Sequence, residues 1–313
     1  MRVVVIGVFD GVHRGHRSLV DRAVARSLEP GASGERDVIA VTFEPHPAAV
    51  LRPDRAPLML TDVDRRRELL LRAGADEVAV VAFDEEFSTQ SPEEFVDYLL
   101  VDLLGGRRVD AIVAGANFRF GQGAQADVAA LREIGRRRGF DVEEVALVTE
   151  RASGTEDAGE PVTWSSTFVR SRIATGDVVT ARRVLGRPHR LDGIVVGGEK
   201  RGRELGYPTA NVDVEEGLAI PHDGVYAGWL IDGDQRWPAA ISVGTNPHFQ
   251  GRSRTVEAYV LGRDDLDLYD HHVGVEFAEL IREQAAFDSL EALVKQMADD
   301  VRRAGEITAV DPS

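Results

Sequence analysis

The chain has 313 residues, 43% of them hydrophobic and 29% charged, which favours a globular protein of two domains. Its formal net charge of −16 argues against broad binding to nucleic acid or to anionic membranes, and its lack of cysteine excludes disulfides, thiolate metal sites and cysteine nucleophiles. No apolar run approaches the roughly 18 residues of a membrane span, and the N-terminus is not of the signal-peptide type, so we expect a cytoplasmic protein.

The first half of the chain alternates short apolar runs with amphipathic segments. The runs typical of buried strands cover residues 3–8, 38–43, 77–83, 109–114 and 141–148. The segments typical of helices cover about 16–26, 62–73, 92–104 and 126–138. Alternation of this kind with short links predicts a parallel, doubly wound α/β sheet.

The pattern changes near residue 186. A polar loop over 150–162 and a helix from Thr167 to about Leu185 precede a series of strands separated by Gly, Asp, Asn and Pro turns. The predicted strands cover residues 191–197, 225–231, 237–243, 255–261 and 273–278. No helix is predicted between them, so this half is expected to be antiparallel, either a barrel or a sandwich. The last predicted element is an amphipathic helix over about 288–304, with an apolar face of Leu290, Leu293, Val294, Met297 and Val301.

A glycine-containing turn over residues 9–16 (FDGVHRGH) joins the first predicted strand to the first predicted helix. In an open α/β sheet, ligands bind beyond the carboxyl ends of the strands, and the amino end of a helix offers N–H groups to phosphate. Gly11 and Gly15 allow close backbone approach, and His13 and His16 supply two donors for charge that develops during attack at phosphorus. The alternative is a pair of surface histidines in a glycine-rich turn.

A second glycine-rich segment covers residues 197–211 (GGEKRGRELGYPTAN). It is not a Walker A loop, because Lys200 does not follow a G-x-x-x-x-G spacing. Its glycines and cations suit wrapping backbone N–H groups around phosphates, and Thr209 and Asn211 offer neutral oxygens to a divalent ion. The alternative is an ordinary glycine-rich hairpin.

Several segments along nearly the whole chain carry a resemblance to a known family. They are residues 9–16 (FDGVHRGH), 42–47 (TFEPHP), 115–121 (GANFRFG), 164–170 (WSSTFVR), 205–211 (LGYPTAN), 243–247 (VGTNP) and 255–260 (TVEAYV). In this order they resemble prokaryotic bifunctional riboflavin kinase/FMN adenylyltransferases. The resemblance implies a doubly wound parallel-sheet nucleotidyltransferase domain over 1–185, then an antiparallel β-barrel flavokinase domain with a C-terminal helix over 186–313.

In the first domain, the resemblance implies transfer of an adenylyl group from ATP to FMN. The implied catalytic residues are His13, His16 and Arg170, with ATP phosphates bound by Gly11, Gly15, Ser165, Ser166 and Thr167. An ordinary Ser/Thr helix cap is the alternative for the 165–167 segment. The implied flavin-binding residues are His46, Asn117 and Arg119. An exposed loop position is the alternative for His46, and pairing with a carboxylate is the alternative for Arg119.

In the second domain, the resemblance implies that Glu257 is the general base for the riboflavin 5′-hydroxyl as it attacks the γ-phosphate of ATP. The alternative is an outward-facing residue, since Glu257 alternates along its strand with apolar neighbours. Thr209 and Asn211 would hold Mg²⁺. The implied phosphate-binding residues are Gly198, Lys200, Gly202 and Gly206, and the implied flavin contacts are Asn246 and Arg254.

The resulting hypothesis is ATP-dependent phosphorylation of riboflavin to FMN, followed by adenylylation of FMN to FAD with release of pyrophosphate. The expected partners are riboflavin, FMN and ATP, with Mg²⁺ as cofactor and with no nucleic acid or membrane partner. Two alternatives stay open at this point. One is an adenylyl- or cytidylyltransferase for another acceptor, against which the LGYPTAN segment argues; the other is a flavin-binding protein that does not turn over ATP.

Overall fold

The computed structural model describes residues 1–29, 36–150, 162–197, 206–245 and 254–310. The chain forms two compact units. The first comprises Met1–Pro57 and Asp62–Ser166, and the second comprises Leu58–Thr61 and Thr167–Ser313. The domain boundary at 185/186 stays a prediction, because the helical segment 167–185 belongs to the second unit in this division.

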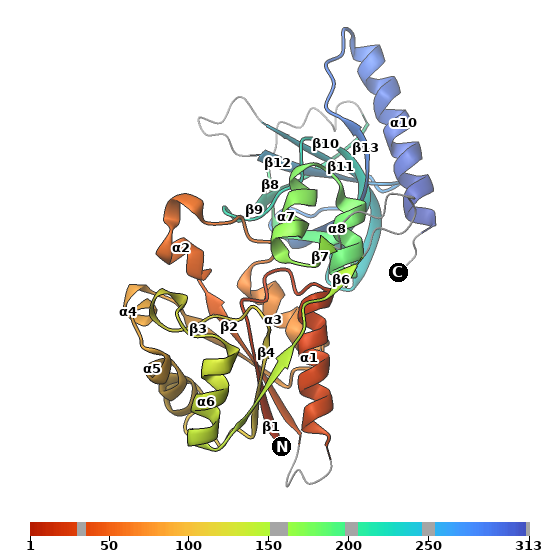
Figure 1. Ribbon diagram of the computed structural model, residues 1–313. Helices are drawn as coiled ribbons and strands as arrows, with labels where there is room; N and C mark the ends of the chain where they lie inside the picture. Colours follow the sequence, from red (N-terminus) through yellow and green to blue (C-terminus); the bar gives the residue numbers. More distant parts are fainter. Residues whose placement is uncertain (30–35, 151–161, 198–205, 246–253, 311–313) are drawn as a thin grey trace, which may run out of the picture. The chain divides into compact units, whose positions relative to one another are not determined.

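The first unit is built on a parallel sheet with the strand order β3-β2-β1-β4-β5 (Figure 1). Its strands are β1 (Arg2–Ile6), β2 (Asp37–Glu44), β3 (Glu77–Ala82), β4 (Ala111–Gly115) and β5 (Asp141–Val145). Every neighbouring pair in this order is parallel. The predicted parallel sheet is therefore confirmed, and each strand overlaps the apolar run that predicted it.

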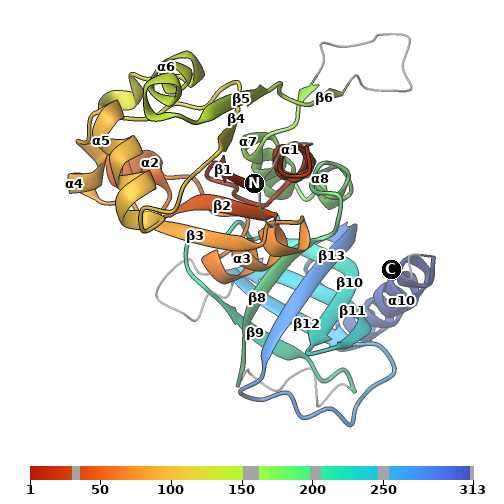
Figure 2. The same cartoon turned by 90° about the horizontal axis from the view of Figure 1, so that it is seen from below.

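Helices cover both faces of this sheet (Figure 2). They are α1 (Arg14–Ser27), α3 (Val63–Arg72), α5 (Pro92–Asp97), the π-helical segment η2 (Tyr98–Leu103) and α6 (Val128–Arg138). Helices α1 and α3 share a core with Val3 and Val5 of β1, whereas α5, η2 and α6 share one with Val4 and Ile6. Because successive residues of a strand point to opposite faces, this division is what a doubly wound sheet requires.

Several short elements of the first unit have no counterpart in the sequence analysis. They are α2 (Pro47–Leu51), η1 (Pro53–Arg55), α4 (Glu85–Ser88), η3 (Gln122–Ala124), β6 (Thr149–Glu150) and β7 (Val162–Thr163). Each is too short to show a helical or strand period. Strands β6 and β7 pair antiparallel at the two ends of the predicted 150–162 loop, and residues 151–161 lie outside the described residues.

The helical segment of the second unit is divided, whereas the sequence analysis predicted one helix. It consists of α7 (Ser166–Ala174) and α8 (Val178–Leu185). Gly176 between them has a φ of +76°, which is outside the helical region and favours glycine. The side chain of Asp177 then accepts a hydrogen bond from Thr180 N–H and caps α8.

The rest of the second unit is a closed barrel with the strand order β10-β11-β12-β9-β8-β13 (Figure 2). Its strands are β8 (His189–Val196), β9 (Ala210–Val214), β10 (Gly224–Asp232), β11 (Gln235–Thr245), β12 (Arg254–Val260) and β13 (His272–Glu283). All of its neighbouring pairs are antiparallel. The structure thus decides between the two predicted architectures in favour of the barrel. It also adds β9, a strand that was not predicted and whose first two residues end the glycine-rich segment 197–211.

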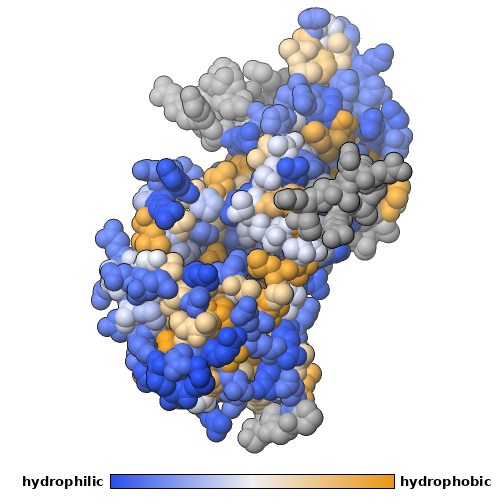
Figure 3. Space-filling model, viewed as in Figure 1, coloured by the Kyte–Doolittle hydropathy of each residue, from blue (hydrophilic) through white to orange (hydrophobic). Residues whose placement is uncertain are grey.

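Helix α10 (Leu290–Ala309) packs along the barrel, against β10, β11 and β13 (Figure 1). Its buried residues are Asp300, Ala304 and Thr308. Of the predicted apolar face, Leu290 is 59% exposed because it stands at the start of the helix, and the other four residues are half-buried. Among the helices that the structure describes, none has the length and apolar character to cross a membrane. The face shown in Figure 3 is mainly hydrophilic.

Candidate active sites in the two units

The order of the parallel sheet brings the motif segments of the first unit to one edge. Strand β1 lies between β2 and β4, and the three run in the same direction. The segments 9–16, 42–47 and 115–121 stand at or beyond the carboxyl ends of these strands. The central strands of an open α/β sheet bind ligands at this edge.

His13 and His16 lie against each other at the start of α1. His13 is the N-cap of the helix, and its Nδ1 accepts a hydrogen bond from the His16 backbone N–H at 3.3 Å. The two imidazole rings are stacked with their centroids 3.7 Å apart, and His13 is 4% exposed. Because Nδ1 of His13 is an acceptor, the neutral ring carries its proton on Nε2 and can donate from that atom.

The backbone of this turn adopts a conformation that few side chains favour. Phe9, Gly11 and Val12 have φ values of 54°, 77° and 37°. Phe9 is fully buried, and its ring meets that of His16 edge to face at 5.3 Å. A Cβ on Gly15 would lie 3.0 Å from the His13 ring, so a larger residue there would displace the ring. The turn therefore fixes both histidines at the positive end of α1, where anions are favoured.

His46 stands just after β2 and caps α2. Its Nδ1 accepts a hydrogen bond from the Ala48 backbone N–H at 3.0 Å, which again leaves the proton of the neutral ring on Nε2. The peptide bond Glu44–Pro45 that precedes it is cis. His46 is thus held by a helix cap just after the end of β2.

The 115–121 segment presents two exposed polar residues beyond β4. Asn117 and Arg119 are exposed, and Arg119 donates a hydrogen bond to the Phe118 carbonyl oxygen at 3.0 Å. Phe118 stacks on Phe120 with ring centroids 5.5 Å apart. The carboxylate near Arg119 is that of Asp127. Its pKa is lowered chiefly by a backbone hydrogen bond from Ala130, and the positive charge of Arg119 lowers it further.

The 164–170 segment joins the first unit at its beginning. The Ser166 hydroxyl donates to the carbonyl oxygen of Asp10 at 2.9 Å, and the Arg14 guanidinium lies over the Trp164 ring at 5.7 Å. Trp164 and Ser166 therefore tie this segment to the histidine turn within the first unit. Thr167 and Arg170 lie in α7, in the part of the chain that belongs to the second unit.

In the second unit, the barrel register brings the predicted base and the predicted metal ligands together. Glu257 of β12 stands directly opposite Asn211 of β9 on one side and Ser242 of β11 on the other. Directly opposite residues of antiparallel strands point to the same face with their Cβ atoms roughly 5 Å apart. The Thr209 hydroxyl donates to Glu257 Oε2 at 3.4 Å. These side chains form an oxygen-rich cluster that sequence spacing alone did not bring together.

Burial along β12 distinguishes the two faces of this strand. Val256, Ala258 and Val260 are buried in the barrel, whereas Glu257 and Tyr259 are half-buried on the other face. Burial raises the pKa of Tyr259, whose ring contacts Tyr207 of the 205–211 segment with centroids 5.3 Å apart. Glu257 therefore does alternate outward from the core, as the alternative assumed, but it faces Asn211 and Thr209.

The remaining predicted residues of this unit fall in different places. Arg254 donates to the carbonyl oxygens of Ile220 and Pro221 and pairs with Asp223, which ties β12 to the 220–223 segment. Gly206 is exposed with a φ of +83°. Four other predicted residues lie outside the described residues: Gly198, Lys200, Gly202 and Asn246.

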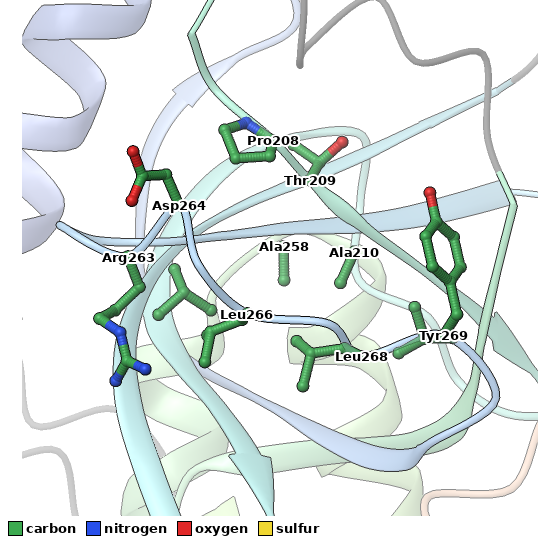
Figure 4. A pocket seen from close by; sticks show the side chains of 11 residues that line it. Pro208, Thr209, Ala210, Ala258, Arg263, Asp264, Leu266, Leu268 and Tyr269 are labelled. Carbon is green, nitrogen blue, oxygen red and sulfur yellow. The ribbon is translucent and has the colours of Figure 1, made fainter.

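A pocket beside Thr209 was not identified from the sequence (Figure 4). Its lining residues are Val195, Pro208, Thr209, Ala210, Ala258, Val260, Arg263, Asp264, Leu266, Leu268 and Tyr269. Leu266 and Leu268 belong to the connection between β12 and β13. The sequence feature that could have indicated this pocket is the pair of leucines within an otherwise acidic loop. Apolar side chains in such a loop suggest that part of it folds back over the protein. In the described residues, no group of three or more His, Cys, Asp or Glu side chains could hold a metal ion.

Comparisons with known proteins assign a family to each half of the chain. The FAD synthetase family matches residues 1–156, and the riboflavin kinase family matches residues 185–308. Bifunctional riboflavin kinase/FMN adenylyltransferases are similar over nearly the full length. The enzyme of Escherichia coli K12 is 34% identical over 97% of this chain and 92% of its own, and that of Pseudomonas fluorescens is 37% identical over 98% and 93%.

A solved structure described as a macrolide-efflux protein from Streptococcus pneumoniae has the same fold. It is 29% identical, covers 97% of this chain and 93% of its own, and has a TM-score of 0.80. The likeness therefore extends over both the parallel sheet and the barrel.

Proposed function

This chain belongs to the family of bifunctional riboflavin kinases/FMN adenylyltransferases, and on that basis we propose roles for its individual residues. The chain phosphorylates riboflavin to FMN and adenylylates FMN to FAD, both at the expense of ATP. The observation that carries the residue roles is the pair of clusters, one in each unit: the stacked histidines at α1 and the Glu257 cluster of the barrel.

For adenylylation, we assign the phosphate contacts to the turn before α1. An oxygen of the FMN phosphate attacks the α-phosphorus of ATP, the bond to the β-phosphate oxygen breaks, and pyrophosphate leaves. His13 and His16 would donate hydrogen bonds to the phosphate oxygens as negative charge develops, and Gly11 and Gly15 would let the backbone approach them. The Nε2–H tautomer of His13, favoured by its N-cap hydrogen bond, supports this role.

The other predicted residues surround this step. Ser165 and Ser166 would hold phosphate through their hydroxyls, together with Thr167 and Arg170. His46, Asn117 and Arg119 would contact FMN. The position of the 42–47 and 115–121 segments, beyond the strands on either side of β1, supports the flavin contacts.

For phosphorylation, we assign the base to Glu257. Its carboxylate would accept the proton of the riboflavin 5′-hydroxyl as that oxygen attacks the γ-phosphorus, and ADP leaves. Thr209 donates to Oε2 of Glu257 and thereby orients the carboxylate. Residues Gly198, Lys200, Gly202 and Gly206 would hold the ATP phosphates, and Asn246 and Arg254 stay candidates for contact with the flavin.

Thr209 and Asn211 are suited to Mg²⁺, because they place two neutral oxygen donors beside a carboxylate on one face of the barrel. We propose that these two residues hold the ion together with ATP phosphates, where it would neutralise phosphate charge. The pocket beside Thr209 would receive the adenine of the same ATP, since it includes Pro208, Thr209 and Ala210 and offers apolar contact from Leu266 and Leu268. Because both reactions consume ATP, we propose that the enzyme works in the cytoplasm.

The decisive experiment supplies riboflavin, ATP and Mg²⁺ to the purified protein and separates the flavins by chromatography with fluorescence detection. Glu257→Gln is expected to abolish FMN formation while added FMN still becomes FAD. His16→Ala is expected to stop FAD formation while FMN accumulates. If either variant lost the other activity instead, the assignment of sites to units would be wrong. Flavin binding without any conversion by the wild type would favour the non-catalytic alternative.

A further inference from the structure

A charged side chain is fully buried beneath the adenylylation site. Arg66 of α3 has an exposure of 0% and is the largest fully buried side chain among the described residues. Placing a guanidinium in a protein core is strongly unfavourable unless hydrogen bonds and an opposite charge compensate it. A buried arginine therefore has to be explained by what it contacts.

The hydrogen bonds of the Arg66 side chain go to the last three residues of β2 and to Val8, which follows β1. Nη1 donates to the Phe43 carbonyl oxygen at 2.8 Å and to the Thr42 hydroxyl at 3.2 Å. The same nitrogen lies 3.5 Å from the Val8 carbonyl oxygen, at the long limit of a hydrogen bond. Nη2 pairs with the Glu44 carboxylate at 2.8 Å. One planar guanidinium thus joins the end of β2 to the connection that follows β1, at the ligand edge of the sheet.

The connection after β1 and the end of β2 lead directly to the candidate phosphate and flavin contacts. Val8 directly precedes Phe9, whose φ of 54° begins the turn that presents His13 and His16. The Val8 carbonyl oxygen is held from a second side by the Thr42 hydroxyl, at 2.8 Å. On the other side, Glu44 is the last residue of β2 and lies two residues before His46. An uncommon backbone conformation persists only where the surrounding structure stabilises it. Arg66 and Thr42 stabilise this one through the Val8 carbonyl oxygen.

We propose that Arg66 is a positioning residue for FMN adenylylation, which fixes the histidine turn after β1 relative to the His46 connection after β2. It contacts neither substrate; it sets the geometry of the residues that do. The proposal rests on the assignment of adenylylation to this site. An arginine that served only to stabilise the core would affect unfolding without changing the rate of the folded enzyme, so kinetics distinguish the two roles.

The test compares steady-state kinetics of FAD formation from FMN and ATP in the full-length wild type, Arg66→Met and Arg66→Lys. Arg66→Met is expected to lower kcat about 100-fold with KM for ATP and FMN nearly unchanged, because a misplacement of about 1 Å has an effect of that size. Arg66→Lys, which keeps the charge and can donate to Phe43 and Glu44, is expected to restore kcat to within about 10-fold of wild type. Riboflavin phosphorylation by the same proteins, which depends on the barrel, should not change.

Arg65→Met is the matched control. Arg65 is the preceding residue of α3, is 8% exposed and pairs with Glu68 of its own helix. Its substitution should leave kcat for FAD formation unchanged. An equal fall of kcat in Arg65→Met, or an unchanged kcat in Arg66→Met accompanied by a lower melting temperature, would overturn the proposal.

A second variant keeps the test decisive if Arg66→Met does not fold. Thr42→Val removes the hydroxyl shared by Arg66 and Val8 with almost no change in volume. It is expected to lower kcat for FAD formation about 10-fold, which is the size of effect of a lost hydrogen bond of about 1.4 kcal/mol; an unchanged kcat would overturn the proposal. His16→Ala is measured alongside. If that variant keeps full activity, the assigned site is wrong, whereas loss in His16→Ala with none in Thr42→Val refutes only the role of Arg66.

Discussion

His189 is a buried histidine in the barrel whose protonation is linked to stability. Its Nε2 is 2.8 Å from the Ala219 carbonyl oxygen, and its ring stacks on Phe277. Desolvation lowers its pKa from 6.5 to about 4. In the unfolded chain, this histidine is protonated below pH 6.5, whereas in the folded chain it stays neutral down to about pH 4. The barrel therefore loses stability as the pH falls from 6.5 to about 4.

We expect the free energy of unfolding of the barrel to fall by about 2 kcal/mol between pH 7 and pH 5 because of His189. His189→Gln, which cannot take up the proton but can still donate to Ala219, should remove that part of the pH dependence. Urea unfolding followed by tryptophan fluorescence of the barrel measures it, with the exposed His271→Gln as control. Equal pH dependence in wild type and His189→Gln would contradict the expectation.

Leu266 provides a residue-scale test of the nucleotide pocket. It is half-buried in the loop after β12 and lines the pocket next to Leu268. Leu266→Ala should remove apolar contact worth about 1 to 1.4 kcal/mol and raise KM for ATP in riboflavin phosphorylation about 5- to 10-fold, with kcat nearly unchanged. The exposed neighbour Asp267→Ala is the control. A rise in KM for riboflavin, with KM for ATP unchanged, would assign the pocket to the flavin.

Sequence reasoning identified residues that sit in recognisable local patterns and missed those defined by distant partners. His13 and His16 are three residues apart at a strand–helix junction, so their proximity follows from the sequence. Arg66 reads as one of three consecutive arginines in a helix, and its partners are 22 to 58 residues away. Only the sheet order, which places β1 beside β2, brings those partners together.

At the scale of elements, α10 is attached to β13 by a buried ion pair. Arg282 donates to both carboxylate oxygens of Asp300 at 2.7 to 3.0 Å, and Gln296 adds a third donor. The side chain of Asp300 is 6% exposed and that of Arg282 is 21% exposed. The apolar pattern predicted the helix but not this polar attachment, since no periodicity marks a carboxylate as buried.

Removing one partner of that pair should weaken the attachment of α10 markedly. Asp300→Ala leaves Arg282 partly buried without its carboxylate, so we expect the barrel to lose about 3 kcal/mol of stability. Asp299→Ala, which removes an exposed carboxylate on the same helix, should change stability by less than about 0.5 kcal/mol. Chemical denaturation of the two variants gives the comparison. A loss of stability of similar size in both variants would show that the Arg282–Asp300 pair contributes no more than an exposed carboxylate does.

Two of the elements that were missed or misjudged from the sequence have different physical causes. Strand β9 covers Ala210–Val214, where Asn211 and Asp213 alternate with the apolar residues and the preceding glycines suggest a loop. Its pairing with β8 and β12, both distant in sequence, makes it a strand. The break between α7 and α8 depends on one glycine and one capping aspartate inside an otherwise helical pattern. Local propensity was thus overridden by cross-strand pairing in one case and by capping in the other.

At the scale of the whole molecule, the chain enters the second unit before the barrel begins. The Met59 backbone N–H donates to the Gly217 carbonyl oxygen, and its carbonyl oxygen accepts from the Ala219 N–H, each at 2.7 Å. The segment Leu58–Thr61 therefore belongs to the second unit although its neighbours on both sides belong to the first. A single cut point in the sequence therefore does not separate the two units.

The helical segment 167–185 offers a direct test of where the kinase unit begins. Val169, Ile173, Val178, Ala181, Val184 and Leu185 are each 2% exposed or less. Gly176 lies against the Tyr226 hydroxyl, and the His222 N–H donates to the Ile173 carbonyl oxygen at 3.2 Å. Burying these side chains stabilises the unit by more than about 5 kcal/mol. That is comparable with the whole stability of a domain, about 5–15 kcal/mol.

We therefore expect a fragment of residues 167–313 to phosphorylate riboflavin and to unfold cooperatively, whereas one of residues 186–313 should be largely unfolded at 25 °C. Circular dichroism and FMN formation measure both properties, and equal stability of the two fragments would place the boundary at 186 after all.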